Sequence, residues 1–350
     1  MNVKGTLASV GRITLAMLVV ASIMAVMPGV AAAQDTANVA PVDDAALSVT
    51  FEDGVIPTVF GDVTLPESRE KVVTLTDGSL DAALAVGVMP VGLTRSSNGE
   101  TVATYLEDEL LGEPVYVGGW GEVEGAGTDI EKIIELQPDL IFSDQWLPGD
   151  QYEQLSKVAP VIAPGTIEVS GPDGLQQWEY ELLVYGQALG KYDEAHAALM
   201  GLRQRAADYA ATSAHAGESV VVFRPQPEFA VVMSQGWITG NVLSWSGFVG
   251  NELSNSTPSP HSGRDVGLER LGELEADWLL AATRDAEMSA ELQNYLENPL
   301  FAQLSAVEND QVVEVSGDLW SGATGVLAAH AMLDDIERIF GAAGTATPAA

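Results

Sequence analysis

The sequence contains no cysteine. Disulfide bonds and zinc–thiolate sites are therefore excluded, so the fold must be stabilised by its core alone. A lipid-modified cysteine at a signal-cleavage site is excluded for the same reason. The four histidines are too dispersed to form a metal-binding motif, and we expect no bound metal and no cofactor; they are His196, His215, His261 and His330.

Positive charge is also scarce. The 350 residues include 15 lysines and arginines against 50 aspartates and glutamates, which gives a formal net charge of −35. Nucleic acid is an improbable partner for such a chain, because phosphate binding needs clustered lysine and arginine. The acidity is typical of a highly soluble protein or of a salty habitat. Because cations are few, each arginine beside a predicted strand end becomes informative.

The common catalytic motifs are missing as well. The sequence has no G-x-S-x-G elbow, no G-x-G-x-x-G fingerprint and no Walker loop. The stretch "GGWGEVEGAG", residues 118–127, is rich in glycine but matches neither phosphate-binding spacing, so we interpret it as a flexible loop. These absences predict a protein that is not an enzyme.

A long apolar run occurs only near the N-terminus. Lys4 and Arg12 precede an apolar segment, Leu15 to Met27, and small residues at 31–33 follow it. This order is typical of a secretory signal, which we predict over residues 1–33 with cleavage before Gln34. A membrane anchor is the alternative, but the run is short for a span of about 20 residues. We expect a soluble, monomeric mature protein in the periplasm or otherwise outside the cytoplasm.

The rest of the chain alternates short β-branched runs with helical segments. Hydrophobic residues make up 47% of the sequence, enough for two domains. The alternation, before and after a long helical stretch, predicts an α/β protein with two parallel-sheet, helix-covered lobes. Gly190 is expected to end the first helix of that stretch. We predict a disordered spacer at 34–47, an N-terminal lobe at 48–170, an interlobe helical segment at 171–216, a C-terminal lobe at 217–340 and a disordered tail at 341–350.

One helix–strand unit occurs twice. "TDIEKIIELQPDL", residues 128–140, is matched by "VGLERLGELEADWLL", residues 266–280. In this register Glu131 aligns with Glu269, and Asp139 aligns with Asp277. An ordinary reading of the two glutamates is a solvated helix N-terminus, where the helix dipole favours acidic residues.

These segments resemble the class III periplasmic substrate-binding proteins of ABC importers, in the ferric-siderophore, haem and cobalamin group. The resemblance covers residues 63–340. It rests on "KVVTLTDGSLDAALAVGVMPVGL", "IEKIIELQPDLIFSD", "WEYELLVYGQALGKYDEA" and "DLWSGATGVLAAHAMLDDIERIF". It implies two lobes joined by one long interlobe helix, with a ligand cleft between them that opens only slightly. It also implies that Glu131 and Glu269 dock onto arginines of the membrane permease.

Candidate ligand-binding residues follow the predicted strands, where open α/β sheets bind ligands. Arginine offers planar donors for carboxylate, catecholate or hydroxamate oxygens, and tryptophan offers rigid stacking area. The alternative is that the tryptophans cap lobe cores and the arginines pair with the abundant acids. The candidates are Arg95, Trp120, Trp146, Arg224, Trp237, Arg264 and Trp320.

We therefore expect an exported binding protein that captures a ferric siderophore and delivers it to an ABC transporter permease. A haem- or cobalamin-binding protein of the same class is an alternative, in which His261 would be an axial ligand. A secreted α/β enzyme of related architecture is a further alternative, but it would need cysteine or clustered histidine ligands. A surface adhesion or structural protein would leave the cleft arginines without a role.

Overall fold

The computed structural model describes residues 42–96, 101–119, 127–169, 171, 173–256 and 263–341. The chain divides into two compact units, Met1–Thr36 and Ala37–Ala350, and every described residue belongs to the second. The predicted signal segment, most of the predicted spacer and nearly all of the predicted tail therefore lie outside the described residues. Asp44–Leu47 (η1), the end of that spacer, forms a 3-10 helix, because Leu47 is buried against the core.

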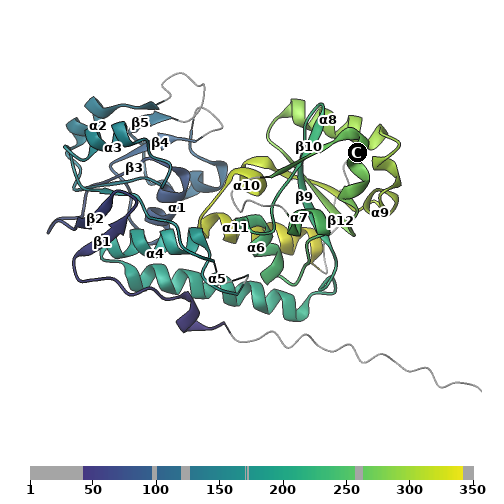
Figure 1. Ribbon diagram of the computed structural model, residues 1–350, viewed down its shortest axis with the longest axis horizontal. Coiled ribbons are helices and arrows are strands. Elements are labelled where there is room, and N and C mark those ends of the chain that lie inside the picture. Colours follow the sequence, from purple (N-terminus) through teal and green to yellow (C-terminus); the bar gives the residue numbers. More distant parts are fainter. Residues whose placement is uncertain are drawn as a thin grey trace, which may run out of the picture. The chain divides into compact units, whose positions relative to one another are not determined.

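The first sheet has six strands in the order β6-β5-β4-β3-β7-β8. Three of them, β3, β4 and β5, are labelled in Figure 1. All neighbours in it are parallel except β5 and β6. The central strand β3 is buried on both faces, as expected for a β-branched run covered by helices. The strands are β3 (Val72–Thr74), β4 (Gly92–Arg95), β5 (Tyr116–Gly119), β6 (Gly127–Thr128), β7 (Leu140–Phe142) and β8 (Val161–Ile162).

Helices and one hairpin accompany this sheet. The antiparallel hairpin of β1 (Val55–Thr58) and β2 (Gly61–Thr64) precedes it. Thr76 and Ser79 form a capping box that starts α1 directly after β3. The helices are α1 (Asp77–Ala85), η2 (Thr104–Glu109), α2 (Ile130–Leu136) and α3 (Gly149–Leu155).

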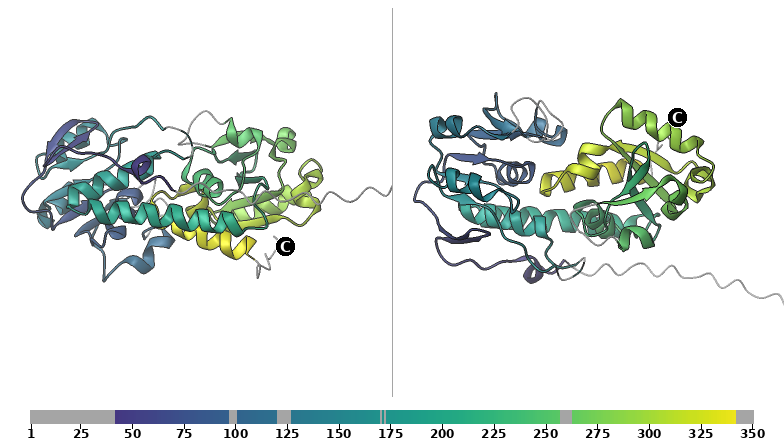
Figure 2. Two further views of the ribbon diagram at one scale, coloured as in Figure 1. Left: turned by 90° about the horizontal axis from the view of Figure 1, so that it is seen from below. Right: turned by 45° about the horizontal axis from the view of Figure 1, so that its top comes forward.

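Two helices join the lobes. α4 (Gln177–Leu189) ends at Gly190, whose left-handed φ of 70° confirms the predicted stop. α5 (Tyr192–Thr212) then contacts α1 and α4 of the first lobe and α6 and α11 of the second. In Figure 2 this long helix passes beneath both sets of strands. The interlobe connection is therefore α5, preceded by a separate helix.

The second sheet has five strands in the order β11-β10-β9-β12-β13. The strands are β9 (Val220–Pro225), β10 (Phe229–Val232), β11 (Arg264–Gly267), β12 (Trp278–Thr283) and β13 (Val312–Ser316). β9, β12 and β13 pair in parallel and β11 runs in the same direction, so the prediction of a parallel sheet is wrong for β10 alone in this sheet, which is antiparallel to β9 and β11. The connection from β9 to β10 is too short for the crossover that parallel strands need.

The helices of this lobe are α6 (Ile238–Trp245), α7 (Glu252–Asn255), η3 (Leu268–Leu274), α8 (Ala286–Glu297), η4 (Phe301–Gln303), α9 (Ser305–Glu308), α10 (Gly317–Gly322) and α11 (Val326–Phe340). The terminal helix α11 begins at Val326. The turn before it contains Gly325 with φ of 123°, which a residue with a side chain rarely adopts.

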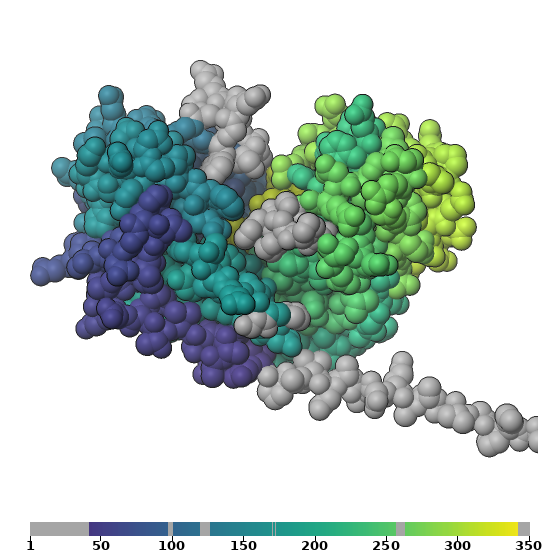
Figure 3. Space-filling view, in the orientation of Figure 1, coloured from purple at the N-terminus to yellow at the C-terminus, as the bar shows by residue number. Residues whose placement is uncertain are grey.

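The two lobes share one hydrophobic core cluster, which includes Phe142, Tyr185, Leu199, Phe248 and Met332. Asp81 of α1 adds a polar tie, because its carboxylate accepts hydrogen bonds from the backbone N–H groups of Leu327 and Ala328 at 3.1 and 3.0 Å. Asp81 thereby caps the N-terminus of α11 from the opposite lobe. The surfaces of the two lobes remain distinguishable by colour in Figure 3.

Candidate functional site

The repeated helix–strand unit contains a repeated hydrogen-bonding role. Asp139 accepts hydrogen bonds from Ser68 Oγ at 2.8 Å and from the N–H groups of Glu70 and Lys71 at 2.9 and 3.0 Å. Asp277 accepts from the N–H and Oγ of Ser219, both at 2.7 Å. Each aspartate thus ties its own strand to the start of the neighbouring central strand. Backbone hydrogen bonds are the main reason that the pKa of both carboxyls is lowered.

The repeated glutamates have a different environment. Glu131 and Glu269 are both exposed, and two residues after each one lies a fully buried residue, Ile133 or Leu271. Neither glutamate forms a hydrogen bond or ion pair with another residue in the described parts of the chain. Both carboxylates are thus available on the surface, at equivalent points of α2 and η3.

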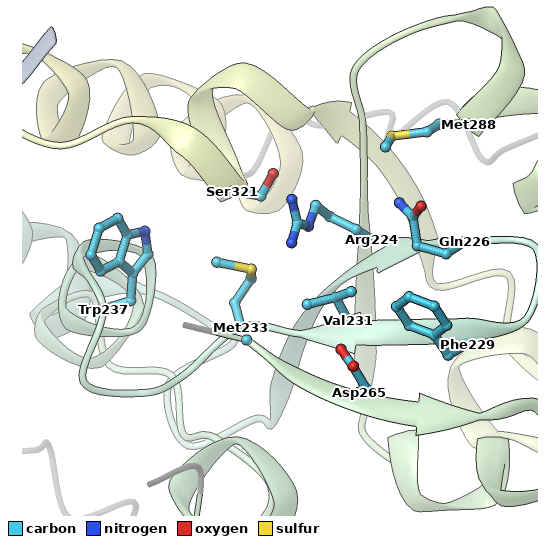
Figure 4. A pocket seen from close by; sticks show the side chains of 10 residues that line it. Arg224, Gln226, Phe229, Val231, Met233, Trp237, Asp265, Met288 and Ser321 are labelled. Atoms are coloured by element: carbon cyan, nitrogen blue, oxygen red, sulfur yellow. The ribbon is translucent and has the colours of Figure 1, made fainter. Parts of the chain in front are cut away.

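A cavity of about 520 Å³ opens beside β9, β10 and β11 in the second lobe. Figure 4 shows the Arg224 guanidinium pointing into it between Ser321 and Met233, with Trp237 on one side. Asp265 of β11 and Met288 of α8 complete much of the wall. The cavity therefore combines one cation with apolar, sulfur and aromatic surfaces.

The surroundings of Arg224 in this cavity disfavour the charged form of its guanidinium. Burial lowers its pKa, and so does the nearby cation of Arg284, whereas Asp265 raises it. Its Nε is buried, and the described residues provide no hydrogen-bond partner for that atom. A buried donor without a partner costs free energy, which an anionic ligand with oxygen acceptors would recover.

Arg284 lies close enough to Arg224 to lower its pKa, and it was not singled out from the sequence. It follows β12 directly, and its Nε lies 3.8 Å from Asp318 Oδ1. A side chain at Gly317 or Gly322 would collide with it, so α10 leaves room for the guanidinium. The signal was present in "LLAATRD", where an arginine ends a strand in the same way as Arg224 does.

A second cavity, of about 310 Å³, lies between the lobes. The first lobe and α4 contribute Asp144, Gln145, Trp146, Thr166, Ile167, Val169, Gln176, Gln177, Trp178 and Glu181; the second lobe contributes Gly236, Trp237, Ile238 and Thr324. Trp237 also lines the first cavity, so the two cavities are neighbours that share this residue. Trp146 is 66% exposed, whereas only an edge of Trp178 is accessible.

Two carboxylates border the second cavity, and neither was singled out from the sequence. Glu181 Oε1 accepts a hydrogen bond from Gln177 Nε2 at 2.9 Å, and burial raises the pKa of Glu181 to about 7. Burial likewise raises the pKa of Asp144. Asp144 follows β7 and Glu181 lies on α4, and the polar spacing of these segments gives no signal, because burial decides the character of both carboxyls.

The expected ligand-binding residues are only partly brought together. Arg224 lines the first cavity, Trp146 the second and Trp237 both. Arg95, at the end of β4, lines neither; its Cζ lies 4.4 Å from the centroid of the Tyr116 ring. Arg264 on β11 also lines neither, and its Nη1 donates to Ser256 Oγ at 3.4 Å.

Trp320 is a correction to the sequence analysis. Its side chain has no solvent exposure, and its Nε1 donates to Asp335 Oδ2 at 2.8 Å. The indole therefore belongs to the core under α10 and α11 rather than to a ligand-binding surface. Trp120 and His261 lie outside the described residues.

Within the described ranges no group of three or more histidine, aspartate or glutamate side chains is arranged to hold a metal ion. No helix in those ranges is long and apolar enough to cross a membrane.

Comparison with known proteins gives a family match. The family described as "Periplasmic binding protein" matches residues 72–319. The achromobactin-binding periplasmic protein of Dickeya dadantii is 29% identical over 308 residues, covering 83% of this chain and 93% of that protein. The Fe(3+) dicitrate-binding periplasmic protein FecB of Escherichia coli is 26% identical over 284 residues, covering 80% and 88%.

Solved structures agree with the fold. Staphylococcus aureus SirA, complexed with staphyloferrin B, superimposes with a TM-score of 0.67 at 22% identity, covering 81% of this chain and 97% of SirA. The catecholate-siderophore binding protein VctP of Vibrio cholerae gives a TM-score of 0.61 at 20% identity, covering 81% and 98%. These likenesses confirm the α/β fold with two lobes.

Proposed function

This chain belongs to the periplasmic binding protein family, and from that premise we propose that it captures an anionic ferric siderophore between its lobes and delivers it to an ABC transporter permease. As a member of that family it is a substrate-binding protein rather than an enzyme. Its curated relatives include proteins named for binding achromobactin and Fe(3+) dicitrate. We extend iron-complex binding from them to this chain.

The observation that carries the proposal is the state of Arg224. Its guanidinium opens into a cavity, its Nε has no hydrogen-bond partner among the described residues, and Arg284 adds a second cation nearby. A protein with a net charge of −35 that keeps two arginines close together there gains most from a ligand with several anionic oxygens. A ferric carboxylate complex has that chemistry.

The dimensions and walls of the site support a ligand larger than a single ion. The two adjoining cavities of about 520 and 310 Å³ provide room for a siderophore-sized molecule. Trp146 and Trp237 offer rigid apolar surface at low entropic cost. Binding would use modest closure of the lobes and no bond chemistry.

We also propose that Glu131 and Glu269 dock onto arginines of the permease. Both are exposed, and they occupy the same position in the duplicated unit. On α2 the adjacent Ile134 is 53% exposed, which is unusual for a large apolar side chain and suits a surface that becomes covered. The protein would act as an exported monomer, released by signal cleavage.

Fluorescence titration tests the ligand. The seven tryptophans provide the signal, and the panel contains ferric dicitrate, one ferric catecholate, one ferric hydroxamate, haem and cobalamin. We expect saturable quenching by a ferric siderophore, reduced in Trp237→Phe, and none by the iron-free chelator. Quenching by haem or cobalamin alone would show that this compound, and not a ferric siderophore, is the ligand. Absence of quenching by every member of the panel would overturn the proposed function.

A further inference from the structure

The two adjoining cavities differ in charge. The first contains Arg224 and lies near Arg284, whereas the described residues that line the second include Asp144 and Glu181 but no lysine, arginine or histidine. Three tryptophans, Trp146, Trp178 and Trp237, border the second cavity as well. A wall of indoles beside carboxylates is the surface that attracts an organic cation.

Glu179 provides an internal comparison for Glu181, two residues away on α4. Glu179 is completely buried, and its two oxygens accept hydrogen bonds from Arg203 at 2.8 and 2.7 Å. Glu181 is partly buried, yet within the described residues its carboxylate accepts only one side-chain hydrogen bond, from the neutral amide of Gln177 at 2.9 Å. The chain thus provides a cation for one buried glutamate and none, among its described residues, for the other.

The missing cation can come from the ligand. A carboxylate taken out of water without a counter-charge is unfavourable, and the nearby Asp144 makes its ionisation harder. A protonated amine would pair with Glu181 through a charge-assisted hydrogen bond while resting on the indole faces. A bare metal ion fits less well, because no group of three such ligands occurs in the described parts of the chain.

We propose that the second cavity binds a protonated amine carried by the ferric ligand, with Glu181 as its counter-ion and Trp146 and Trp237 as its aromatic walls. This inference rests on the proposed function and narrows it to a zwitterionic ligand. The anionic, iron-bearing part would face Arg224, and the amine arm would pass Trp237, where the two cavities adjoin.

A matched pair of probes tests the inference. One is ferric dicitrate with one terminal carboxyl converted to a 2-aminoethyl amide; the other is the same complex with that amine acetylated. Titration calorimetry at pH 7 should show the amine probe binding wild type about tenfold more tightly, the size of one charge-assisted hydrogen bond. Glu181→Gln should remove that preference by weakening the amine probe alone, and Asp144→Asn should reduce it by about threefold.

Controls separate the possible outcomes. Exposed Glu153 on α3 provides the matched variant Glu153→Gln, which should bind both probes as wild type does. Equal affinity of wild type for both probes, or equal weakening of both by Glu181→Gln, overturns the amine site. Binding of ferric dicitrate with rejection of the amine probe overturns it too and leaves the proposed function standing. No binding of these three complexes or of the siderophore panel overturns both proposals.

Discussion

The two copies of the duplicated unit have the same register but different helices. α2 is an α-helix, whereas η3 is a 3-10 helix. Asp129 caps α2 by accepting a hydrogen bond from Lys132 N at 3.0 Å, but the matching residue before η3 is Gly267, which has no side chain to do so. Gly272 stands where α2 has Ile134 and further weakens the helix.

The two copies share the contacts that attach the unit to its sheet. Ile133 and Leu271 are both fully buried, and Asp139 and Asp277 both tie a strand to the start of its neighbour. The core contact and the strand anchor therefore fix the register, while the type of helix is free to vary. Glu131 and Glu269 therefore occupy equivalent exposed positions even though α2 and η3 are different types of helix.

The cavity-lining ends of the lobes diverge much further. The first lobe contributes Trp146 and Asp144, whereas the second contributes Arg224 and Arg284. The antiparallel β10 of the second lobe helps to build the arginine-bearing cavity, because its residues Phe229 and Val231 line it. The helix–strand unit is repeated in the two lobes, but the side chains that each lobe places at the cavities differ in charge and type.

The largest expected effect concerns the shared glutamates. Glu131→Ala combined with Glu269→Ala should abolish the import of iron by cells that depend on this protein, while ligand affinity stays unchanged, because both docking charges are lost. Uptake of radiolabelled ferric ligand measures this. Glu135→Ala with Glu273→Ala, one turn further along each copy, is the control. Normal uptake by the first double variant would refute docking.

A smaller effect is expected on ligand affinity, for which Arg224 of the second lobe is compared with Arg95 of the first. Arg224→Gln should weaken binding of the ferric ligand roughly 30-fold, because a desolvated charge pair is lost. Arg95→Gln should change affinity by less than about threefold, since Arg95 lies against Tyr116 and outside both cavities. Calorimetric titration measures both affinities. Without ligand, Arg224→Gln should unfold at the same temperature as wild type or higher, because a buried unpaired donor is removed.

The anchoring aspartates should affect stability rather than binding. Asp139→Asn should lower the free energy of unfolding by about 1 kcal/mol, and Asp277→Asn by somewhat less, because Asp139 accepts from three groups and both sites are partly solvated. Urea unfolding at pH 7 measures the difference. A larger loss for Asp277→Asn would reverse the comparison.

The same variants have a defined pH dependence. Folding lowers the pKa of both carboxyls below the ordinary value of 3.8, so the stabilisation is complete above that value and is lost as the pH falls through the lowered pKa. The gap in stability between wild type and either variant should therefore be constant from pH 7 to about pH 5 and should shrink below about pH 4. A gap that grows on acidification would contradict this assignment.

The smallest effect tests the difference between the helices. Gly272→Ala should stabilise the protein by about 0.5 kcal/mol, because the glycine lies in open space within η3 and alanine restricts the unfolded chain more. Ile134→Gly is the opposite change at the matching position of α2 and should destabilise the protein by a similar or larger amount. Thermal unfolding measures both. Destabilisation by Gly272→Ala would show that η3 is not limited by helix propensity.

The sequence predicted the scaffold better than the site. The β-branched strands, the stop at Gly190 and the register of the repeat could all be read from local patterns, because they depend on hydrophobic period and backbone preference. Arg224 and Trp237 were predicted from their place after strands, and both line a cavity. Arg284 has the same signal and was missed, and Trp320 has it too but is buried, because α10 turns its indole into the core.

By itself, the sequence predicted export and two α/β halves, and it determined the absence of disulfides, a net charge of −35 and a duplicated unit with glutamates in register. Only the tertiary structure decided which arginine is buried and which tryptophans line a cavity. It also decided that Glu179 is paired with a cation, whereas Glu181 has none among the described residues. The physical reason is that hydrophobic period and backbone propensity are local, whereas desolvation and charge pairing depend on residues far apart in the chain.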